Sequence, residues 1–176
     1  MKNNQLHQFR RVYVASIIRI LNAYVFPFDF RRWAEESLKV LEAYQAAGEN
    51  LFDFSPALEE IGLLHRTLSQ FYSKWEKAFR QGKKEPQGLR KINQCLLELG
   101  RILIPTDYTR AGRYSHDPAV PIPSFPGLEP IRQLPLFSPD GNEHRFLQAQ
   151  LLRERNKVID ALKQARRVVE RYEENI

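Results

Sequence analysis

The fold class is decided by residues 55–82, which read SPALEEIGLLHRTLSQFYSKWEKAFRQG. Ser55 can cap a helix, Pro56 fits a first helical turn, and Gly82 can end the helix. Between these signals, positions three and four residues apart share one face of a helix. That face carries Leu58, Ile61, His65, Leu68, Tyr72, Trp75 and Phe79. We therefore predict a long amphipathic helix over this stretch.

Four further stretches show the same periodicity when the chain is followed outward. They run from about Leu6 to Ala23, from Phe30 to Ala47, from Pro86 up to Pro105, and from Asn142 to Glu174. Asp29 is a good N-cap for the second helix, Gly48 can end it, and Pro105 is expected to end the fourth. Isolated helices of this kind are marginal in water, so we expect them to pack against one another. The prediction is an all-α, antiparallel four-helix-type bundle that forms a single domain over residues 1–176.

One segment, residues 105–141, interrupts the helical pattern. It holds eight of the eleven prolines. A connection of this length inside a compact domain is usually functional or disordered. Its aromatic and aliphatic residues argue against disorder, because they give the segment something to bury. We predict a long, ordered, proline-rich loop before the last helix, packed on the bundle or on a partner.

Composition and charge narrow the function classes. The hydrophobic fraction of 43% and the charged fraction of 27% are ordinary for a globular protein, and the net charge is +6. This charge permits nucleic acid as a partner, but the cations of the last helix are interleaved with acids, which favours a solvated face. The same reading applies to Glu59 and Glu60. A basic helical bundle that binds nucleic acid is therefore the alternative function and not the first one.

The ends and apolar runs of the sequence say little about its compartment. No apolar run approaches the length of about 20 residues that a membrane-spanning helix needs. Arg10, Arg11 and Arg19 interrupt the first apolar stretch, so it does not read as a signal peptide. The sequence therefore leaves the localisation open.

Residues that could carry chemistry are few and scattered. The histidines are His7, His65, His116 and His144. None forms a His-Glu-x-x-His pair, and His65 is expected to be a hydrogen-bonded core histidine. Tyr114, His116 and Asp117 are close in sequence, and an enzyme built on them is a minor alternative. Cys95 lies in an apolar pattern and is expected to be a buried, inert thiol. No catalytic residue and no metal ligand is predicted.

Two short motifs carry a family resemblance. Residues 25–30 read VFPFDF between the first two predicted helices, and residues 124–128 read SFPGL in the proline-rich segment. Pro27 prevents the first helix from continuing, and Pro126-Gly127 favours a turn after Phe125. In this order and spacing, the motifs resemble the transferrin-receptor-like dimerisation domain. That domain ends the chains of glutamate carboxypeptidases and transferrin receptors, and the resemblance covers nearly the whole chain.

The resemblance implies a non-catalytic homodimerisation domain with two partners, a second copy of the chain and a zinc-peptidase domain. In the family, zinc and the catalytic glutamate belong to the peptidase domain, which these residues lack, so no cofactor is expected here. The residues it marks as interface or structural positions are Pro27, Phe28, Asp29, Tyr114, Ser124, Phe125, Pro126 and Gly127. We expect Phe28 and Phe125 to be contact residues, and for Phe125 a place in the domain's own core is an equal alternative.

One departure from the family concerns its substrate pocket. Carboxypeptidase members that recognise a C-terminal glutamate carry a Lys-Tyr pair shortly before Ser-Phe-Pro-Gly. The corresponding residues here are 118–122, which read PAVPI and provide neither a cation nor a phenol. We therefore carry over no substrate-binding residue from the family.

Overall fold

The protein is all-α, as predicted, in a computed structural model that describes residues 2–82, 85–110, 117 and 119–173, with side chains from Phe9 onward. No strand occurs in these ranges. The helices are α1 (Lys2–Leu21), α2 (Phe30–Gly48), α3 (Ser55–Arg80), α4 (Pro86–Tyr108), the 3-10 helix η1 (Glu129–Leu136) and α5 (Asn142–Glu173). None of the helices in the described ranges has the length and apolar character to cross a membrane.

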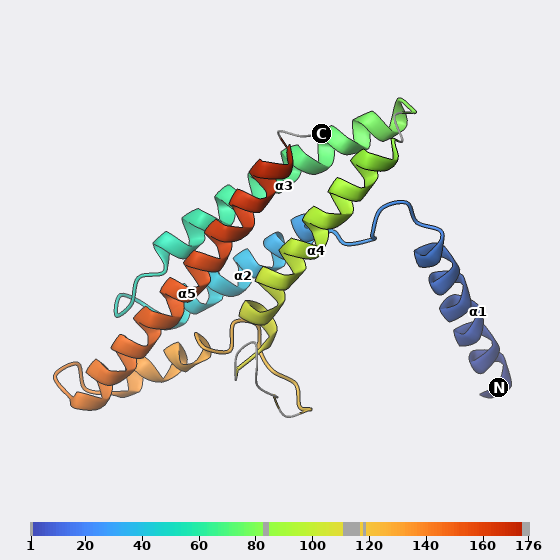
Figure 1. Cartoon of the computed structure of the whole chain (residues 1–176). Helices are drawn as coiled ribbons and strands as arrows, with labels where there is room; N and C mark the ends of the chain where they lie inside the picture. Colours follow the sequence, from blue (N-terminus) through green and yellow to red (C-terminus); the bar gives the residue numbers. More distant parts are fainter. Residues whose placement is uncertain (1, 83–84, 111–116, 118, 174–176) are drawn as a thin grey trace.

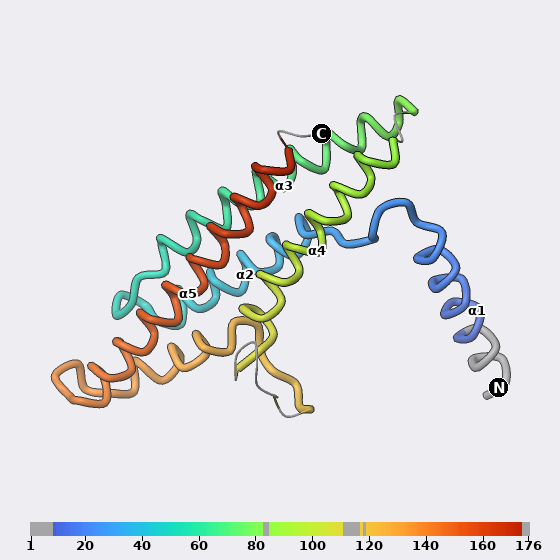
Figure 2. Tube along the Cα trace, viewed as in Figure 1, coloured from blue at the N-terminus to red at the C-terminus, as the bar shows by residue number. Residues whose placement is uncertain are grey.

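The three longest helices of the body, α3, α4 and α5, lie side by side (Figure 1). The colours of the trace show that α3 and α5 run in one direction and that α4 returns in the other (Figure 2). Helix α2 packs on α3, and η1 contacts both α2 and α5. Helix α1, in contrast, stands apart and contacts no other helix of the described chain. The prediction that all five helices pack together is therefore wrong for α1.

The core lies between α2, α3, α4 and α5 and is built from much of the predicted faces of α2, α4 and α5. On α3 the buried face is shifted from the predicted one, since Leu64 and Phe71 are buried and His65 is not, and the connections and η1 add further residues. The largest fully buried side chains of the core are Leu41, Phe54, Ile61, Leu64, Leu68, Phe71, Leu96, Leu99, Leu103, Phe125, Leu128 and Ile131. Cys95 is buried among them with a free thiol, as predicted, and burial raises its pKa to about 12. Because the thiolate is the reactive form, this cysteine is chemically quiet near neutral pH.

Two side chains of α3 differ from their predicted places. His65 is not in the core, since its side chain is 36% exposed and Nε2 lies 3.3 Å from Oε1 of Glu35. Glu60 is not on a solvated face, since it is buried and Oε1 accepts a hydrogen bond of 2.8 Å from Nε of Arg166. Arg166 also bonds Glu170, so the buried carboxylate of Glu60 shares a cation with a half-exposed neighbour. Periodicity alone did not reveal this pair because its members are 106 residues apart.

Two predicted helix ends differ in the structure, namely the start of α3 and the end of α4. The start of α3 is capped by Phe54, and Ser55 is its first helical residue, with its N–H bonded to the carboxylate of Asp53 at 2.8 Å. Pro105 does not end α4, which continues to Tyr108. A proline so near the end removes only one helical hydrogen bond, and buried Asp107 holds the last turn against the rest of the fold.

The proline-rich segment is ordered and packs on the bundle where the structure describes its inner part, residues 124–136. It contains η1, which the sequence did not predict, and buries Ile131 and Leu134. A Cβ placed on Gly48, at the end of α2, would lie 2.9 Å from Cδ1 of Ile131. The absence of a side chain at position 48 therefore allows η1 to approach α2 closely.

Candidate interaction surface

The Pro27–Asp29 corner joins α1 to α2. The N–H of Phe28 donates to the carbonyl of Phe26 at 2.8 Å, which makes a tight turn around Pro27. Asp29 caps α2, as predicted, and accepts a hydrogen bond of 3.0 Å from the N–H of Arg31. The guanidinium of Arg31 also bonds both oxygens of Asp29 at 2.9 Å, and this contact lowers the pKa of the Asp29 carboxyl.

Tyr72 of α3 binds the backbone of this corner. Its hydroxyl donates a hydrogen bond of 2.5 Å to the carbonyl of Phe28 and accepts one of 3.2 Å from the N–H of Phe30. The guanidinium of Arg31 lies 4.3 Å from the centre of the Tyr72 ring. Burial raises the pKa of Tyr72, so its hydroxyl stays neutral and able to donate. One side chain thus satisfies two backbone groups at the start of α2.

Asn93 of α4 fixes the connection further back along the chain. Its Nδ2 donates to the carbonyl of Tyr24 at 3.0 Å, and its Oδ1 accepts from the N–H of Phe26 at 2.9 Å. The ring of Tyr24 also lies 6.3 Å from the ring of Phe79 on α3. The chain that leaves α1 is therefore held by both α3 and α4, and it does not hang freely.

An apolar groove of about 610 Å³ lies between this corner and α4. One wall is formed by Pro27, Phe28, Phe30 and Trp33, and the other by Leu96, Leu97, Gly100, Ile104 and Pro105, with Asp29 and Arg101 as its polar lining. Phe28 is 47% exposed and Ile104 is 53% exposed. A Cβ on Gly100 would lie 3.7 Å from Ile104 and 3.8 Å from Phe30, so glycine leaves room that a side chain would occupy.

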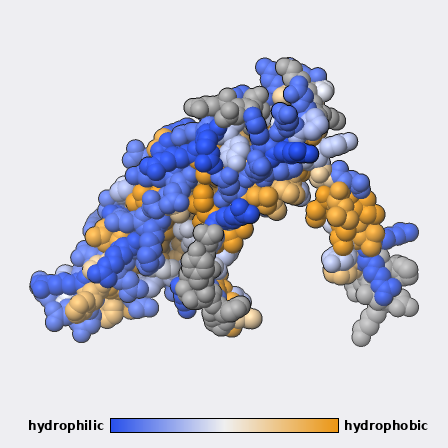
Figure 3. All heavy atoms as spheres, in the orientation of Figure 1, coloured by the Kyte–Doolittle hydropathy of each residue, from blue (hydrophilic) through white to orange (hydrophobic). Residues whose placement is uncertain are grey.

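The apolar side chains of α1 are the second part of the surface. They are exposed to between 38% and 77% of their area. The group consists of Phe9, Val12, Tyr13, Val14, Ile17, Ile18, Ile20 and Leu21. The space-filling view shows them as a concentrated apolar area on α1, away from the charged body of the protein (Figure 3). We call the groove and these side chains together the apolar surface.

The Ser124–Gly127 motif packs against the body through Phe125 and Pro126, which are buried, while Ser124 and Gly127 are partly exposed. Phe125 was predicted to lie either in a partner contact or in the core. It is 1% exposed and therefore lies in the core. Its N–H donates to the backbone carbonyl of Asp107 at 3.0 Å, and its backbone has a positive φ of 50°. The carbonyl of Ser124 accepts a hydrogen bond of 2.8 Å from the hydroxyl of Tyr44. The motif thus fastens the proline-rich segment to α2 and α4.

The buried carboxylate of Asp107 connects the two motifs. It accepts a hydrogen bond of 2.8 Å from Nε1 of Trp33, which lines the groove, and one of 3.3 Å from the N–H of Phe125. The rings of Trp33 and Phe125 also meet edge to face, with centroids 6.4 Å apart. Phe125 of the motif therefore packs behind Trp33, a residue of one groove wall, although Phe125 does not line the groove itself.

The other residues singled out in the sequence lie in different parts of the structure. Pro126 is buried, and a Cβ on Gly127 would come within 2.6 Å of Oε2 of Glu154. Tyr114 and His116 lie outside the described residues. Asp117 accepts hydrogen bonds of 3.1 Å from the N–H of Arg110.

Part of the apolar surface was missed in the sequence. The apolar face predicted for α4 contains Leu96 and Leu99, and the structure buries both in the core. Leu97 and Ile104 lie off that face, yet they are large and apolar, and they line the groove. Large apolar residues outside the buried stripe of an amphipathic helix were the signal that could have found it.

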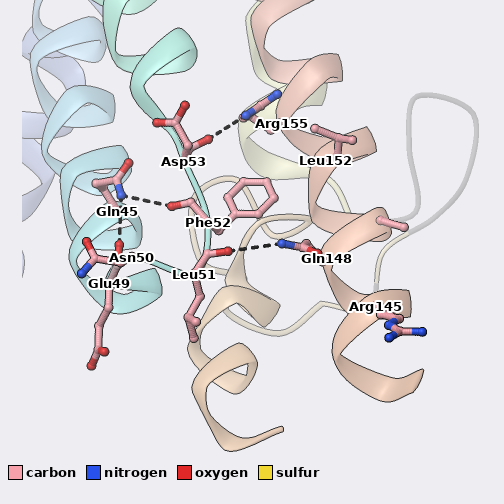
Figure 4. Close-up of a pocket in the computed structure, with 11 residues that line it drawn as sticks. Gln45, Glu49, Asn50, Leu51, Phe52, Asp53, Arg145, Gln148, Leu152 and Arg155 are labelled. Carbon is pink, nitrogen blue, oxygen red and sulfur yellow. Dashed lines mark hydrogen bonds between the residues drawn. The ribbon is translucent and has the colours of Figure 1, made fainter. Parts of the chain in front are cut away.

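A larger hollow of about 700 Å³ lies between the α2–α3 connection and α5 (Figure 4). Its polar side chains bond the backbone of that connection. Nη1 of Arg155 donates to the carbonyl of Asp53 at 2.7 Å, and Gln45 donates to the carbonyl of Phe52 at 3.1 Å. Gln45 thus holds the connection to α2 and Arg155 holds it to α5, although Nε of Arg155 is buried without a hydrogen-bond partner, and we assign the hollow a structural role.

Charged groups elsewhere form pairs and not a single patch. On α5, Lys157 lies 2.6 Å from Glu154, and Arg166 bonds Glu60 and Glu170. Among the residues that the structure describes, no three His, Cys, Asp or Glu side chains lie close enough to hold a metal ion. The apolar surface is therefore the feature from which function is best argued.

Comparison with known proteins gives no match, whether to a protein-family model, to a curated protein or to a solved structure.

Proposed function

We propose that this chain is a non-catalytic helical interaction domain that forms a homodimer. The single observation that carries the proposal is α1, a formed helix whose apolar side chains contact no other helix of the described chain. A single helix is marginal in water and is normally stabilised by packing of its apolar face. A helix formed without such contacts within its own chain favours the presence of a partner that covers the apolar side chains of α1.

The size of the exposed area supports a protein partner. The eight apolar side chains of α1 expose on the order of 900 Å², and each partner of a standard interface buries ~800 Å². Exposed apolar side chains concentrated on one helix are typical of an interaction site. The groove beside the Pro27–Asp29 corner adds a second apolar area of complementary, concave shape.

The resemblance to the transferrin-receptor-like dimerisation domain agrees with this proposal. Both of its motifs make contacts that shape the groove. Residues 25–30 form the corner that Tyr72 holds, and Phe125 of the second motif packs against the ring of Trp33. In a protein of that family a zinc-peptidase domain would be the second partner. Any zinc would belong to that domain, and we propose no cofactor for the residues of this chain.

The solution mass of the purified chain tests the proposal. Light scattering over a concentration series is expected to give twice the chain mass of 20.7 kDa. Ile17→Glu should shift the protein towards the monomer, because it places a charge in the apolar face of α1. Ala15→Glu is the matched control, because it adds the same charge on the opposite side of the same helix. A monomer at every concentration would overturn homodimerisation.

A further inference from the structure

The first step concerns where α1 can reach. Only Asn22 and Ala23 separate its last residue, Leu21, from Tyr24, and Tyr24 is held by Asn93 and by the ring of Phe79. The next residues along the chain, up to Asp29, are fixed by Asn93 and Tyr72. The trace shows α1 pointing away from the bundle beyond this fixed connection (Figure 2). With only two residues between α1 and this fixed connection, the stretch of chain available to bring α1 into the groove of its own copy is short.

The second step concerns the match between helix and groove. At 100° per residue, Phe9, Tyr13, Ile17, Ile20 and Leu21 fall within one third of the circumference of α1. Arg11 and Arg19 fall on the other side, where they would remain in water. Arg10 falls inside the apolar third, between Ile17 and Leu21, near the start of the helix, so its aliphatic stem would lie in the contact and its charged end would reach out to water. A helix that lays such a face into an apolar groove is a common mode of recognition. The groove is lined mainly by apolar side chains, which suits this face.

The third step concerns the floor of the groove. Leu97, Gly100 and Ile104 are spaced three and four residues apart, so they form one row along α4. Because Gly100 has no side chain, the row has a gap between two exposed aliphatic residues. A side chain from an incoming helix can enter such a gap, as ridges enter grooves when helices pack.

We propose that α1 of one copy docks in the groove of a second copy, whose α1 docks in return. This inference rests on the proposed homodimer and names the surfaces that form it. Each α1 would bury its apolar face against the groove beside Phe28, and the contact would occur twice. The groove and the docking third of α1 would then be covered by a single two-fold arrangement, whereas Val12, Val14 and Ile18 lie outside that third.

Disulfide trapping between two differently tagged chains tests this arrangement. One chain carries Ile17→Cys and the other carries Leu97→Cys, and mild oxidation of the mixture should yield a covalent dimer with one chain of each kind. Tyr13→Cys with Ile104→Cys provides a second pair, since a disulfide forms only when the two Cα atoms come within ~7 Å. Native Cys95 is buried with a raised pKa and should not compete. Ala15→Cys with Leu97→Cys is the control pair and should give no mixed dimer.

The outcomes separate this inference from the proposed function. If light scattering shows a dimer but no pair is trapped between chains, the dimer forms elsewhere, and only the docking of α1 is overturned. If the chain is a monomer, both proposals fail. A double variant, Ile17→Cys with Leu97→Cys in one chain, should give a covalent dimer. A covalent monomer instead would mean that α1 occupies its own groove.

Binding strength gives a second readout that does not depend on disulfide geometry. Leu97→Arg should raise the dimer Kd at least ~10-fold, because it places a charge in the docked apolar contact. Phe146→Arg is the control, since Phe146 is 76% exposed on α5 and lies outside the groove. An equal Kd for both variants would overturn the assignment of the groove.

Discussion

The hydroxyl of Tyr72 lies 2.5 Å from the carbonyl oxygen of Phe28, a residue 44 positions earlier in the chain. The same hydroxyl accepts a hydrogen bond from the N–H of Phe30. One phenol oxygen thus bonds the backbone of the Pro27–Asp29 corner and the first residue of α2, next to the ion pair of Arg31 with Glu76 on α3. The groove wall that contains Phe28 is positioned by the contact with Tyr72.

Removal of this hydroxyl should therefore destabilise the fold. Tyr72→Phe keeps the ring but leaves two backbone groups without their partner, and we expect a loss of about 1–3 kcal/mol in the free energy of unfolding. Urea denaturation followed by circular dichroism measures the change. Phe146→Leu is the control, because that ring is 76% exposed and lies outside the groove. An unchanged midpoint for Tyr72→Phe would contradict the role of the contact.

Asp107 should be more sensitive than an ordinary surface acid. It is 1% exposed and accepts hydrogen bonds from Trp33 and from the N–H of Phe125. Asp107→Ala leaves the indole N–H buried without a partner and opens a small cavity, so we expect a loss of about 2–4 kcal/mol. Asp140→Ala, at an exposed position, should change the unfolding free energy little. Urea denaturation measures the unfolding free energy of both variants. Similar losses in Asp107→Ala and Asp140→Ala would refute the prediction.

Gly48 and Ile131 should be coupled. Gly48→Ala brings a methyl group within 2.9 Å of Ile131 Cδ1 in a fully buried contact, which should cost about 1–3 kcal/mol by overpacking. Ile131→Val removes that methyl group of isoleucine, so the double variant should recover part of the loss. A double-mutant cycle measures the coupling. Strictly additive effects would show that the two residues do not limit each other.

Asp29 should make stability depend on pH in the acid range. Its pKa is lowered in the folded protein, mainly by the hydrogen bond with Arg31. A lowered folded pKa gives a contribution that is present above the unfolded value of about 3.9 and is lost as pH falls through the lower folded value. The side chain is 48% exposed, so solvent screening keeps this contribution small.

The melting temperatures of the wild type and of Asp29→Asn measure this contribution. The wild type should be the more stable of the two near neutral pH, and the gap should narrow as pH falls below about 4. Asp140→Asn serves as the matched control at an exposed position. A gap that stays constant across the range would assign the effect to geometry and not to charge.

The sequence predicted the helices because each has a local signature. Asp29 caps α2, and Leu41 and Tyr44 fall on its buried face, as the period of three and four requires. The pattern shows which residues share a face but not what that face meets. For that reason α1 was predicted as a helix correctly, whereas its separation from the bundle was not.

Parts of the surface depended on contacts between distant residues. Phe125 could fill the core or a partner's surface on sequence grounds, and its place was decided by Asp107 and Trp33. The 3-10 helix η1 has too short a period and too many prolines to stand out in a search for α-helices. The groove was missed because its walls come from two helices that only the fold brings together.

The two hydrogen bonds of Asn93 have a consequence for how copies of the chain can assemble. These bonds fix the point from which α1 leaves the body, and in the proposed dimer a pair that exchanges helices would fill both grooves and leave no site open for a third chain. A loose connection would let α1 reach a different neighbour at each end, and such head-to-tail contacts build filaments of indefinite length. In the proposed dimer, the side chain of Asn93 would therefore favour a closed pair over an open chain of copies.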